Sequence, residues 1–335
     1  MTRIRRARAE DAPAIARMAA ALSAAEGSPA PAFDAAAYQY PGFGKDPCFE
    51  VLLAEVDDRP AGYALYHPSY DTDRVVRAVW LADLYVESWA RGTGLGRRLA
   101  AQVAATAAAA GSEAMHWGVL RTNHRARRFY ARFAREDDSL LYCHMAEAAL
   151  ATLAGTSPAS AATIRPAGRE DAPLLGRMLT ALLQSLGADP LGFDPVPRLA
   201  ADGFGPHPRF AALVAEVGAE AAGYALFWPI YDTEMGGPLM FLSDLFVAEA
   251  ERGRGLAEDL MGAVARRALA AGHRGMSWEV LRDNHRARAF YRRLTAESDA
   301  VIVVNCAGDD FRRLAAEAPA GLSLRRRRTV SRWRM

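Results

Sequence analysis

The chain has 335 residues, of which 51% are hydrophobic and 24% charged, a composition typical of globular proteins and not of disordered ones. Its length predicts two or three domains. The net charge of +2 is uneven, because residues 325–335 hold six arginines; the rest has 35 basic and 39 acidic residues, a charge of −4, so we expect no nucleic-acid partner for the body of the chain.

The sequence contains an internal repeat. Residues 61–72 and 222–233 are identical at nine of twelve positions, and residues 117–130 and 278–291 at eleven of fourteen, both at an offset of 161. Two repeats of this length predict two domains and not a solenoid. We expect domains at residues 1–150 and 162–317, a linker at 151–161, and a basic, disordered tail at 318–335.

Each copy is predicted to hold the same elements in the same order. A strand (4–7; 164–167) leads into a helix (12–25; 172–186), and a hairpin follows (50–56 with 61–67; 211–217 with 221–228). A strand (79–86; 239–247), a glycine-rich loop and a long helix (95–110; 256–271) come next. A strand (114–120; 275–281), a short helix (123–132; 284–293) and a final strand (139–145; 299–305) close each half. This order predicts an α/β fold with a mixed sheet split around its central strands.

The glycine-rich loops carry the pattern Arg-x-x-Gly-x-Gly/Ala, at residues 91–96 and 252–257. Backbone amides at a helix N-terminus bind anions, and glycines let a pyrophosphate approach the backbone. The loops lack the Gly-Lys-Ser/Thr ending of a P-loop and the Gly-x-Gly-x-x-Gly spacing of a Rossmann turn. The simpler alternative is a tight turn that only caps a helix.

With their neighbouring motifs, these loops resemble the acyl-CoA loop of GNAT-family N-acetyltransferases, over about residues 2–147 and 162–306. The branch acting on diamines, polyamines and lysine-like amines shares the motifs at Gly62–Tyr66, Tyr70–Thr72, Leu81–Val86 and Asn123–Tyr130, each with its copy. The resemblance implies two tandem GNAT-like domains, each with a mostly antiparallel sheet splayed at the acyl-CoA site and flanked by helices. It implies acetyl-CoA as co-substrate, a small-molecule amine as acceptor, and no metal.

The resemblance also implies roles for individual residues. The end of one strand would pair with the pantetheine arm, the glycine loop would hold the pyrophosphate, and an asparagine would contact the CoA arm. In the first half these residues are Leu84, Tyr85, Val86, Arg91, Gly92, Thr93, Gly94, Leu95, Gly96, Arg97 and Asn123. In the second half they are Leu245, Phe246, Val247, Arg252, Gly253, Arg254, Gly255, Leu256, Ala257 and Asn284.

Tyr130 and Tyr291 would be the catalytic residues, as general acids that protonate the departing thiolate. The alternatives are aromatic packing for the tyrosines and helix capping for the asparagines.

The pattern departs from the branch at one position in each half. The branch carries a glutamate before the aspartate of Leu-Glu-Asp, implicated in binding and deprotonating the amine, where this chain has Ala82 and Ser243. The departure leaves the general base unassigned. Candidate substrate residues are the aspartates that remain, Asp71, Asp83, Asp232 and Asp244, although Asp71 and Asp232 are equally compatible with solvated loops.

The two glycine loops differ in charge. Arg97 and Arg98 follow the first, whereas Glu258 and Asp259 follow the second, where acids are unfavourable beside a pyrophosphate. We therefore expect tighter acetyl-CoA binding in the first half.

Other features concern setting and assembly. The three scattered cysteines exclude a disulfide framework, and no apolar run is long enough to span a bilayer, so we expect a cytoplasmic protein without a membrane partner. Relatives of this branch are typically homodimers, so the fused copies would form an intramolecular pseudo-dimer, existing as a monomer or a dimer of fused chains.

Three further hypotheses compete with a small-amine acetyltransferase. The chain could be a non-catalytic or half-active acyl-CoA-binding regulatory module, which the loss of the glutamates would favour and the intact tyrosines disfavour. It could be a tandem acetyltransferase of the mycothiol-synthase type. It could bind nucleic acid or protein through Arg325–Arg328.

Overall fold

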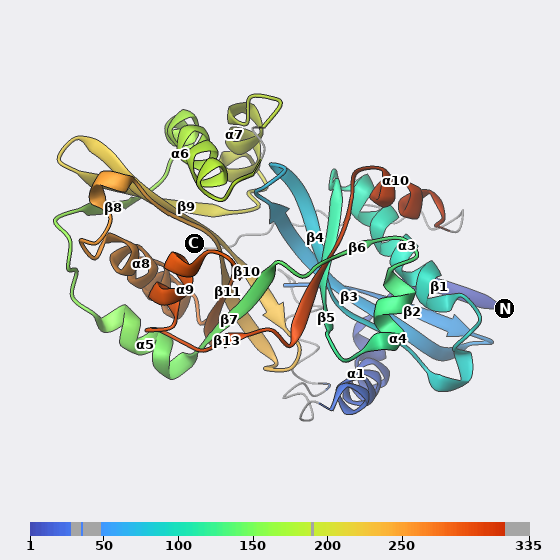
Figure 1. Cartoon of the computed structure of the whole chain (residues 1–335). Helices are drawn as coiled ribbons and strands as arrows, with labels where there is room; N and C mark the ends of the chain where they lie inside the picture. The colour runs from blue at the N-terminus through green and yellow to red at the C-terminus, as the bar shows by residue number, and fades with distance from the viewer. Residues whose placement is uncertain (28–34, 36–47, 189–190, 319–335) are drawn as a thin grey trace.

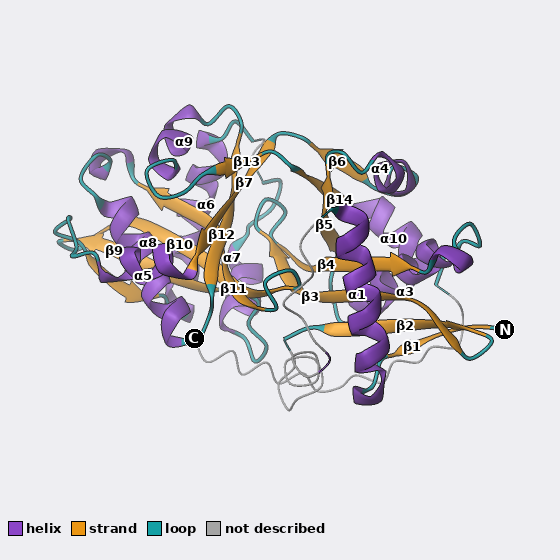
Figure 2. Cartoon of the chain, turned by 90° about the horizontal axis from the view of Figure 1, so that it is seen from below, coloured by secondary structure: helices purple, strands orange, loops and turns teal. Residues whose placement is uncertain are grey.

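The computed structural model describes residues 1–27, 35, 48–188 and 191–318, and these form two seven-stranded sheets (Figures 1 and 2). Residues 319–335 of the predicted basic tail lie outside the described residues. Among the described residues, no helix combines the length and apolar character needed to cross a bilayer.

The strands are given in their order across each sheet. The first sheet consists of β1 (Thr2–Arg6), β2 (Glu50–Val56), β3 (Arg59–Asp71), β4 (Val76–Val86), β5 (Ala114–Leu120), β14 (Val301–Ala307) and β6 (Arg135–Asp137). The second consists of β13 (Glu297–Ser298), β7 (Leu140–Ala146), β12 (Gly275–Leu281), β11 (Gly237–Val247), β10 (Glu220–Asp232), β9 (Ala211–Val217) and β8 (Thr163–Pro166).

Three helices of each half lie where the sequence predicts them. The helices of the first half are α1 (Ala12–Glu26), α3 (Leu95–Ala109), α4 (His124–Tyr130) and α5 (Glu147–Gly155). Those of the second are α6 (Ala172–Ser185), α7 (Val196–Phe204), α8 (Leu256–Ala270), α9 (His285–Tyr291) and α10 (Gly308–Ala316). Of these, α5, α7 and α10 are not among the predicted elements. Helix α5 occupies the start of the predicted linker, so the irregular connection is shorter than expected.

The final strands are exchanged between the halves. Strand β14 pairs antiparallel with β5 of the first half along its whole length, from Val301 opposite Leu120 to Ala307 opposite Ala114. Strand β7 pairs in the same way with β12 of the second half. The prediction that each final strand closes its own half is therefore wrong: each closes the other half, as the crossing of red and green strands in Figure 1 shows.

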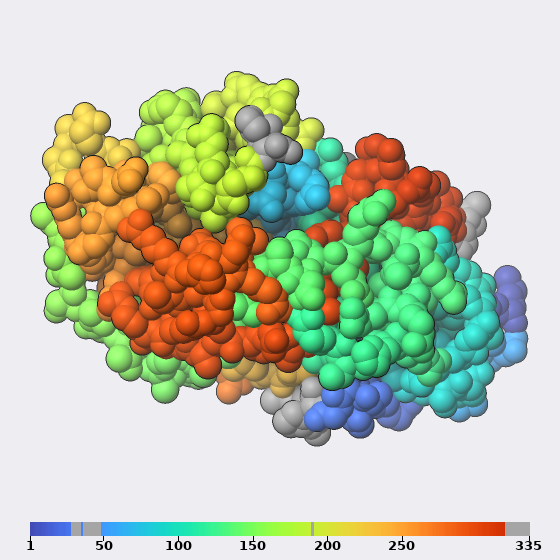
Figure 3. Space-filling view, in the orientation of Figure 1, coloured from blue at the N-terminus to red at the C-terminus, as the bar shows by residue number. Residues whose placement is uncertain are grey.

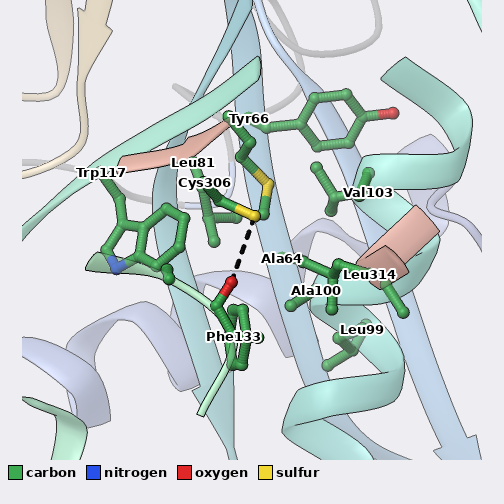
Figure 4. Close-up of a cluster of buried hydrophobic side chains, with 14 of the residues drawn as sticks. Ala64, Tyr66, Leu81, Leu99, Ala100, Val103, Trp117, Phe133, Cys306 and Leu314 are labelled. Carbon is green, nitrogen blue, oxygen red and sulfur yellow. Dashed lines mark hydrogen bonds between the residues drawn. The ribbon is translucent and has the colours of Figure 1, made fainter. Parts of the chain in front are cut away.

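The helices that follow these strands cross over with them. Helix α10 packs on α3, and α5 packs on α8, so the red α10 lies over the first half in Figure 3. Cys306 and Leu314 enter the core formed by Leu99, Val103 and Trp117, and the Cys306 thiol donates a hydrogen bond to the Phe133 carbonyl (Figure 4). Each fully buried aliphatic side chain exchanged in this way contributes about 1.5–3 kcal/mol.

Alternating side chains explain why each sheet carries helices on both faces. In β2, Leu52 and Ala54 join the core beneath α3, whereas Val51 and Leu53 join the core beneath α1. Successive side chains of a strand point to opposite faces, so a strand that is apolar at every position requires a cover on each side. In Figure 2, α1 crosses the strands of the first sheet.

Both sheets are splayed between their two central parallel strands. Strands β4 and β5 pair only from Ala78 opposite Ala114 to Trp80 opposite His116, although both strands continue beyond. Strands β11 and β12 pair only at Met240 and Phe241. The predicted split of the sheet is thus observed, and it leaves the far ends of β4 and β11 without a neighbour on that side.

A β-bulge lies at the start of each splay. Leu65 is opposite Asp83 and Tyr66 is opposite Leu81, so Ala82 is the extra residue on β4. Ser243 is the extra residue at the same place on β11. Bulges re-aim side chains and are frequent beside active sites. The two positions that depart from the acetyltransferase pattern are therefore the two bulged residues.

The strand exchange leads to a test of how the halves are held together. We expect a chain cut within the exposed residues 156–158, at an inserted protease site, to remain one particle in native buffer, because each half keeps a strand and a helix of the other. Size-exclusion chromatography with light scattering would measure this, and we expect thermal unfolding in a single transition. Separation of the fragments without denaturant would contradict the exchange.

Candidate active sites

A cavity of about 480 Å³ in the second half gathers the residues predicted to hold acetyl-CoA. Its lining includes the end of β11, the glycine loop, the first turn of α8, Asn284 and Tyr291. Of the predicted cofactor residues of this half, only Arg254 is not part of the lining; its guanidinium pairs with Glu251 instead. The strand end, the helix N-terminus and the tyrosine thus face one space, which fits an elongated thiol ester with a pyrophosphate.

The glycines of both loops adopt the left-handed conformation that the pattern requires. Gly92 and Gly94 have φ of 82° and 80°, and Gly253 and Gly255 have 78° and 84°. A side chain at such φ angles is strained, so these positions favour glycine. Gly94 and Gly255 stand directly before the first residues of α3 and α8, whose first amides have no acceptor within the helix.

The arginine of each loop has a structural partner. The Arg91 side chain donates from Nε to the Val86 carbonyl at 2.8 Å, and Arg252 does the same to Val247 at 2.9 Å. Each arginine therefore fastens its loop to the end of the preceding strand. Asn123 and Asn284 likewise cap α4 and α9 by accepting from the amides of Ala126 and Ala287. Their predicted contacts with CoA stay predictions.

The charge difference between the loops is smaller than the sequence implies. The Arg97 guanidinium forms two hydrogen bonds, of 2.6 and 2.7 Å, with Glu317 at the end of α10. The Asp259 carboxylate accepts hydrogen bonds from the backbone amides of Ala159 and Ser160, at 2.9 and 2.8 Å. Glu317 of the exchanged segment thus neutralises Arg97, and the connection after α5 satisfies the Asp259 carboxylate with hydrogen bonds, so we expect only a modest difference in CoA affinity.

The two candidate general acids are buried in equivalent aromatic surroundings. Tyr130 and Tyr291 are 9% and 8% exposed, and their rings lie 4.9 and 5.2 Å from those of Trp117 and Trp278. Burial raises the pKa of both tyrosines above the ordinary value, and for Tyr130 the charges of Glu26 and Asp83 raise it further. Both hydroxyls therefore stay protonated at neutral pH, as a proton donor must.

A second cavity, of about 460 Å³, lies between the two sheets and is shared by the halves. Its described lining contains Tyr130 and many acidic side chains but only two basic ones, Arg74 and His116. The carboxylates are Glu26, Asp71, Asp73, Asp83, Asp137, Asp232, Glu234 and Glu279. Within the described ranges, no three His, Cys, Asp or Glu side chains converge as a metal site would require.

The loop between β3 and β4 and its copy between β10 and β11 each reach the bulged strand of the other half. The Thr233 hydroxyl donates to Asp83 at 2.9 Å, and Tyr63 donates to the same carboxylate at 2.8 Å. Of the four candidate substrate residues, Asp71, Asp83 and Asp232 line the shared cavity.

In the second half, Thr72 and Ser243 share a hydrogen bond of 3.1 Å, and Ser243 donates to Asp244 at 2.8 Å. Asp244 is buried behind these partners and is not part of the cavity lining. Each active-site region is thus built from both halves.

Asp71 has a structural role as well as a place in the cavity. Its carboxylate accepts from the Arg74 amide and side chain, at 2.9 and 2.8 Å, and lies 3.4 Å from Nε2 of His116. Burial alone would raise the pKa of Asp71, but His116 and Arg74 outweigh it and lower this pKa to about 2. His116 in turn bonds to Asn305 on the exchanged β14 at 2.7 Å.

Several carboxyls of the cavity have pKa values above the ordinary ones. Burial raises the pKa of Asp83 and of Asp73 to about 6, and neighbouring aspartates add to the effect. Burial raises the pKa of Glu26 and of Glu279 to about 7. Mutual repulsion and exclusion from water are the physical causes. A cation in this cavity would relieve the repulsion.

Sequence reasoning missed three residues of this cavity: Glu26, His116 and Asn305. Glu26 is the sole acid of the fifteen-residue helix α1, a signal that was available. His116 and Asn305 lie 189 residues apart and meet only through the exchanged strand, so no local pattern could have linked them.

Comparison with known proteins shows the family. The model of the acetyltransferase (GNAT) family matches residues 15–134 and 179–295. Thialysine N-epsilon-acetyltransferase from Mus musculus is 34% identical over 145 residues, covering 41% of this chain and 85% of the mouse protein. The enzyme of the same name from Bos taurus is 34% identical over 104 residues, covering 29% of this chain and 61% of the bovine protein.

Two similar solved structures are more distant in sequence. A tandem GNAT protein from the clavulanic acid biosynthesis pathway is 16% identical, with a TM-score of 0.49 and coverage of 92% of this chain and 98% of that one. A GCN5-related N-acetyltransferase from Sphaerobacter thermophilus is 18% identical, with a TM-score of 0.47 and coverage of 91% and 95%. Because the family model matches well over half of the chain, in two separate regions, the chain belongs to the acetyltransferase (GNAT) family.

Proposed function

We propose that the protein transfers the acetyl group of acetyl-CoA to a primary amine of a small, cationic molecule by direct attack. Membership of an acetyltransferase family supports acetyl-CoA-dependent N-acetylation. The observation that carries the choice of acceptor is the shared cavity, which brings together eight carboxylates and two basic side chains. A protonated amine is attracted to such a site and can also be steered toward it.

The cavity has the features of an acceptor site. It reaches Tyr130 and the edge of the splayed sheet near Asp83 and Leu84, and it includes the aromatic side chains of Trp80, Trp228 and Phe241. Aromatic and acidic groups together suit an amine with an aliphatic chain, because the chain packs on the rings and the charge faces the carboxylates. Its volume suits a ligand the size of a diamine or a lysine-like amino acid.

The residues of each site would act in sequence. Bound acetyl-CoA supplies the thioester carbonyl and the thiolate leaving group. The loop amides before α3 and α8 would neutralise the pyrophosphate, and the unpaired edges of β4 and β11 would align the pantetheine arm. Tyr130 and Tyr291, protonated because they are buried, would donate the proton that the thiolate needs.

The alternative functions have fewer observations in their favour. A half-active or regulatory CoA-binding module is favoured by Ala82 and Ser243, and it is the outcome if no amine is acetylated. A mycothiol-synthase-like reaction has no observation in its favour beyond the tandem repeat. The cytoplasmic setting, the domain limits and the state of the fused chain, as monomer or dimer, stay predictions.

The function can be tested with tyrosine variants. We expect the chain to release thiol from acetyl-CoA with at least one of 1,4-diaminobutane, spermidine, lysine and thialysine. Tyr130→Phe and Tyr291→Phe should each remove the turnover of one site, and the double variant should lose about 10²–10⁴-fold, the usual contribution of a general acid. Titration with CoA should be unchanged in all three. Full activity in the double variant would contradict the assignment of the general acids.

The raised pKa values of the cavity predict how stability depends on pH. Glu279 has a folded-state pKa of about 7 against an ordinary 4.5, so it binds its proton more tightly when folded. Its ionisation therefore lowers the free energy of unfolding as pH rises from about 4.5 to about 7. We expect Glu279→Gln to raise Tm at pH 8 by a few degrees, equivalent to about 1–3 kcal/mol, and to change it much less at pH 5.

Calorimetry at the two pH values would measure the difference. Gln is close in shape, and Oε1 of Glu279 has no hydrogen-bond partner in the described part of the chain. The exposed Glu220→Gln is the matched control. A Tm loss of equal size at both pH values would contradict the prediction.

A further inference from the structure

Glu26 lines the shared cavity beside the first candidate active site. It is the last residue of α1, and with Ala19, Leu22 and Ser23 it forms the face of the helix that lines the shared cavity. Glu26 interacts electrostatically with three groups of other elements. These are Asp83 on β4, Glu234 from the β10–β11 turn of the other half, and Tyr130 on α4.

The described surroundings of Glu26 disfavour an ionised glutamate as far as folding stability is concerned. The C-terminal end of a helix carries a partial negative charge, which disfavours an anion. The surroundings add two more carboxylates and partial burial, and burial is the largest cause of the raised pKa of Glu26, about 7. A carboxyl held in such surroundings and facing a cavity is typical of an acid–base group.

The bulged Ala82 makes room for this carboxylate. Ala82 packs in the same core cluster as Ile15, Met18 and Ala19 of α1, and it lines the cavity together with Glu26. The position from which the related enzymes present a carboxylate is thus filled here by a methyl group against α1. The end of α1 presents a carboxylate to the same space from a different element.

We propose that Glu26 is the general base of the first active site and takes the proton that the acceptor amine loses, directly or through one water. The nitrogen forms its bond to the acetyl carbon as its proton passes to Glu26. The carbon–sulfur bond then breaks, its electron pair stays on sulfur, and Tyr130 protonates the sulfur. The products are the acetylated amine and the free CoA thiol; Glu26 then releases its proton to solvent, and Tyr130 takes one up.

The second half has no such base at the equivalent position. Gly27 and Gly187 both end their helices in the left-handed conformation, with φ of 72° and 74°, so Glu26 corresponds to Leu186. Leu186 lines the cavity that holds Tyr291. Ser243 is bonded to Thr72 and Asp244 and does not supply a carboxylate. We therefore infer that the two sites differ in their chemistry and that the first carries most of the turnover.

This assignment rests on the proposed function, and the experiment separates the two. In a Tyr291→Phe background, which leaves the first site, we expect Glu26→Gln to lower kcat by about 10²-fold or more with spermidine or thialysine while KM changes only a few-fold. The acidic limb of the kcat profile near pH 7 should disappear, and Glu26→Asp should restore part of the rate. CoA affinity, measured by calorimetry, should not change.

The matched control is Glu26→Gln in a Tyr130→Phe background, where we expect the remaining turnover of the second site to be unaffected. Equal losses in both backgrounds would show a general structural effect and overturn the assignment. A large rise in KM with kcat retained would make Glu26 an amine-binding charge and not a base. Unchanged kinetics in the Tyr291→Phe background would overturn the assignment alone, whereas no turnover by the unaltered chain with any amine would overturn the proposed function as well.

Discussion

The exchange of β7 and β14 is the constraint on which the other features of the molecule depend. Neither sheet is complete without a strand from the other half, and each exchanged strand brings a helix that packs beside the long helix of its host. The halves are thereby held with their splayed edges facing each other. That arrangement places the β3–β4 turn of one half on the bulge of the other and encloses the acidic cavity between them.

Because the two copies are fused in one chain, they can differ in sequence, unlike the subunits of a homodimer. In a pair of identical chains every substitution appears in both sites, whereas here each appears once. Three of the differences between the copies fall at residues that line the two cavities: Glu26 against Leu186, Ala82 against Ser243, and Gly118 against Glu279. The buried aromatic pair of Trp and Tyr is the same in both halves, with nearly the same ring separation. The proposed proton donor is therefore kept twice, while the surroundings of the proposed acceptor site have become different.

The order of elements could be predicted from the sequence, because hydrophobic period and turn residues are local signals that the repeat doubles. The sheet that the final strand of each half joins could not be predicted from the sequence. Val301–Ala307 and Leu140–Ala146 have similar alternation, so either would fit the edge of either sheet, and the choice depends on how far the preceding segment can reach. The splay was expected from resemblance, but the bulge at Ala82 was not, since one extra residue in a strand leaves no periodic signature.

The sequence grouped the glycine-loop residues that line one cavity, but of the shared cavity it named Asp71, Asp83 and Asp232 and missed other members, for the same reason. Loops such as Arg91–Gly96 are contiguous in the sequence, and their glycines report a backbone conformation directly. The acceptor cavity draws its carboxylates from α1, from the β3–β4 turn and from the other half, so its members share no spacing. Such a constellation becomes visible only when the exchanged strands bring the two halves together.

Several carboxyls of the acidic cavity lower the free energy of unfolding at neutral pH. Carboxyls at positions 26, 73, 83 and 279 all have raised pKa values, so each resists ionisation in the folded chain and each costs free energy at neutral pH. Ion pairs elsewhere, such as Arg5 with Asp11 and Arg165 with Asp171, show that this chain places arginines beside carboxylates where only folding is concerned. Among the carboxyls of the cavity, Asp71 is paired in this way, with Arg74 and His116. The carboxyls at positions 26, 73, 83 and 279 have no ion pair within the part of the chain that the structure describes, which makes sense if a positive charge arrives with the substrate and argues for a cationic acceptor independently of any resemblance.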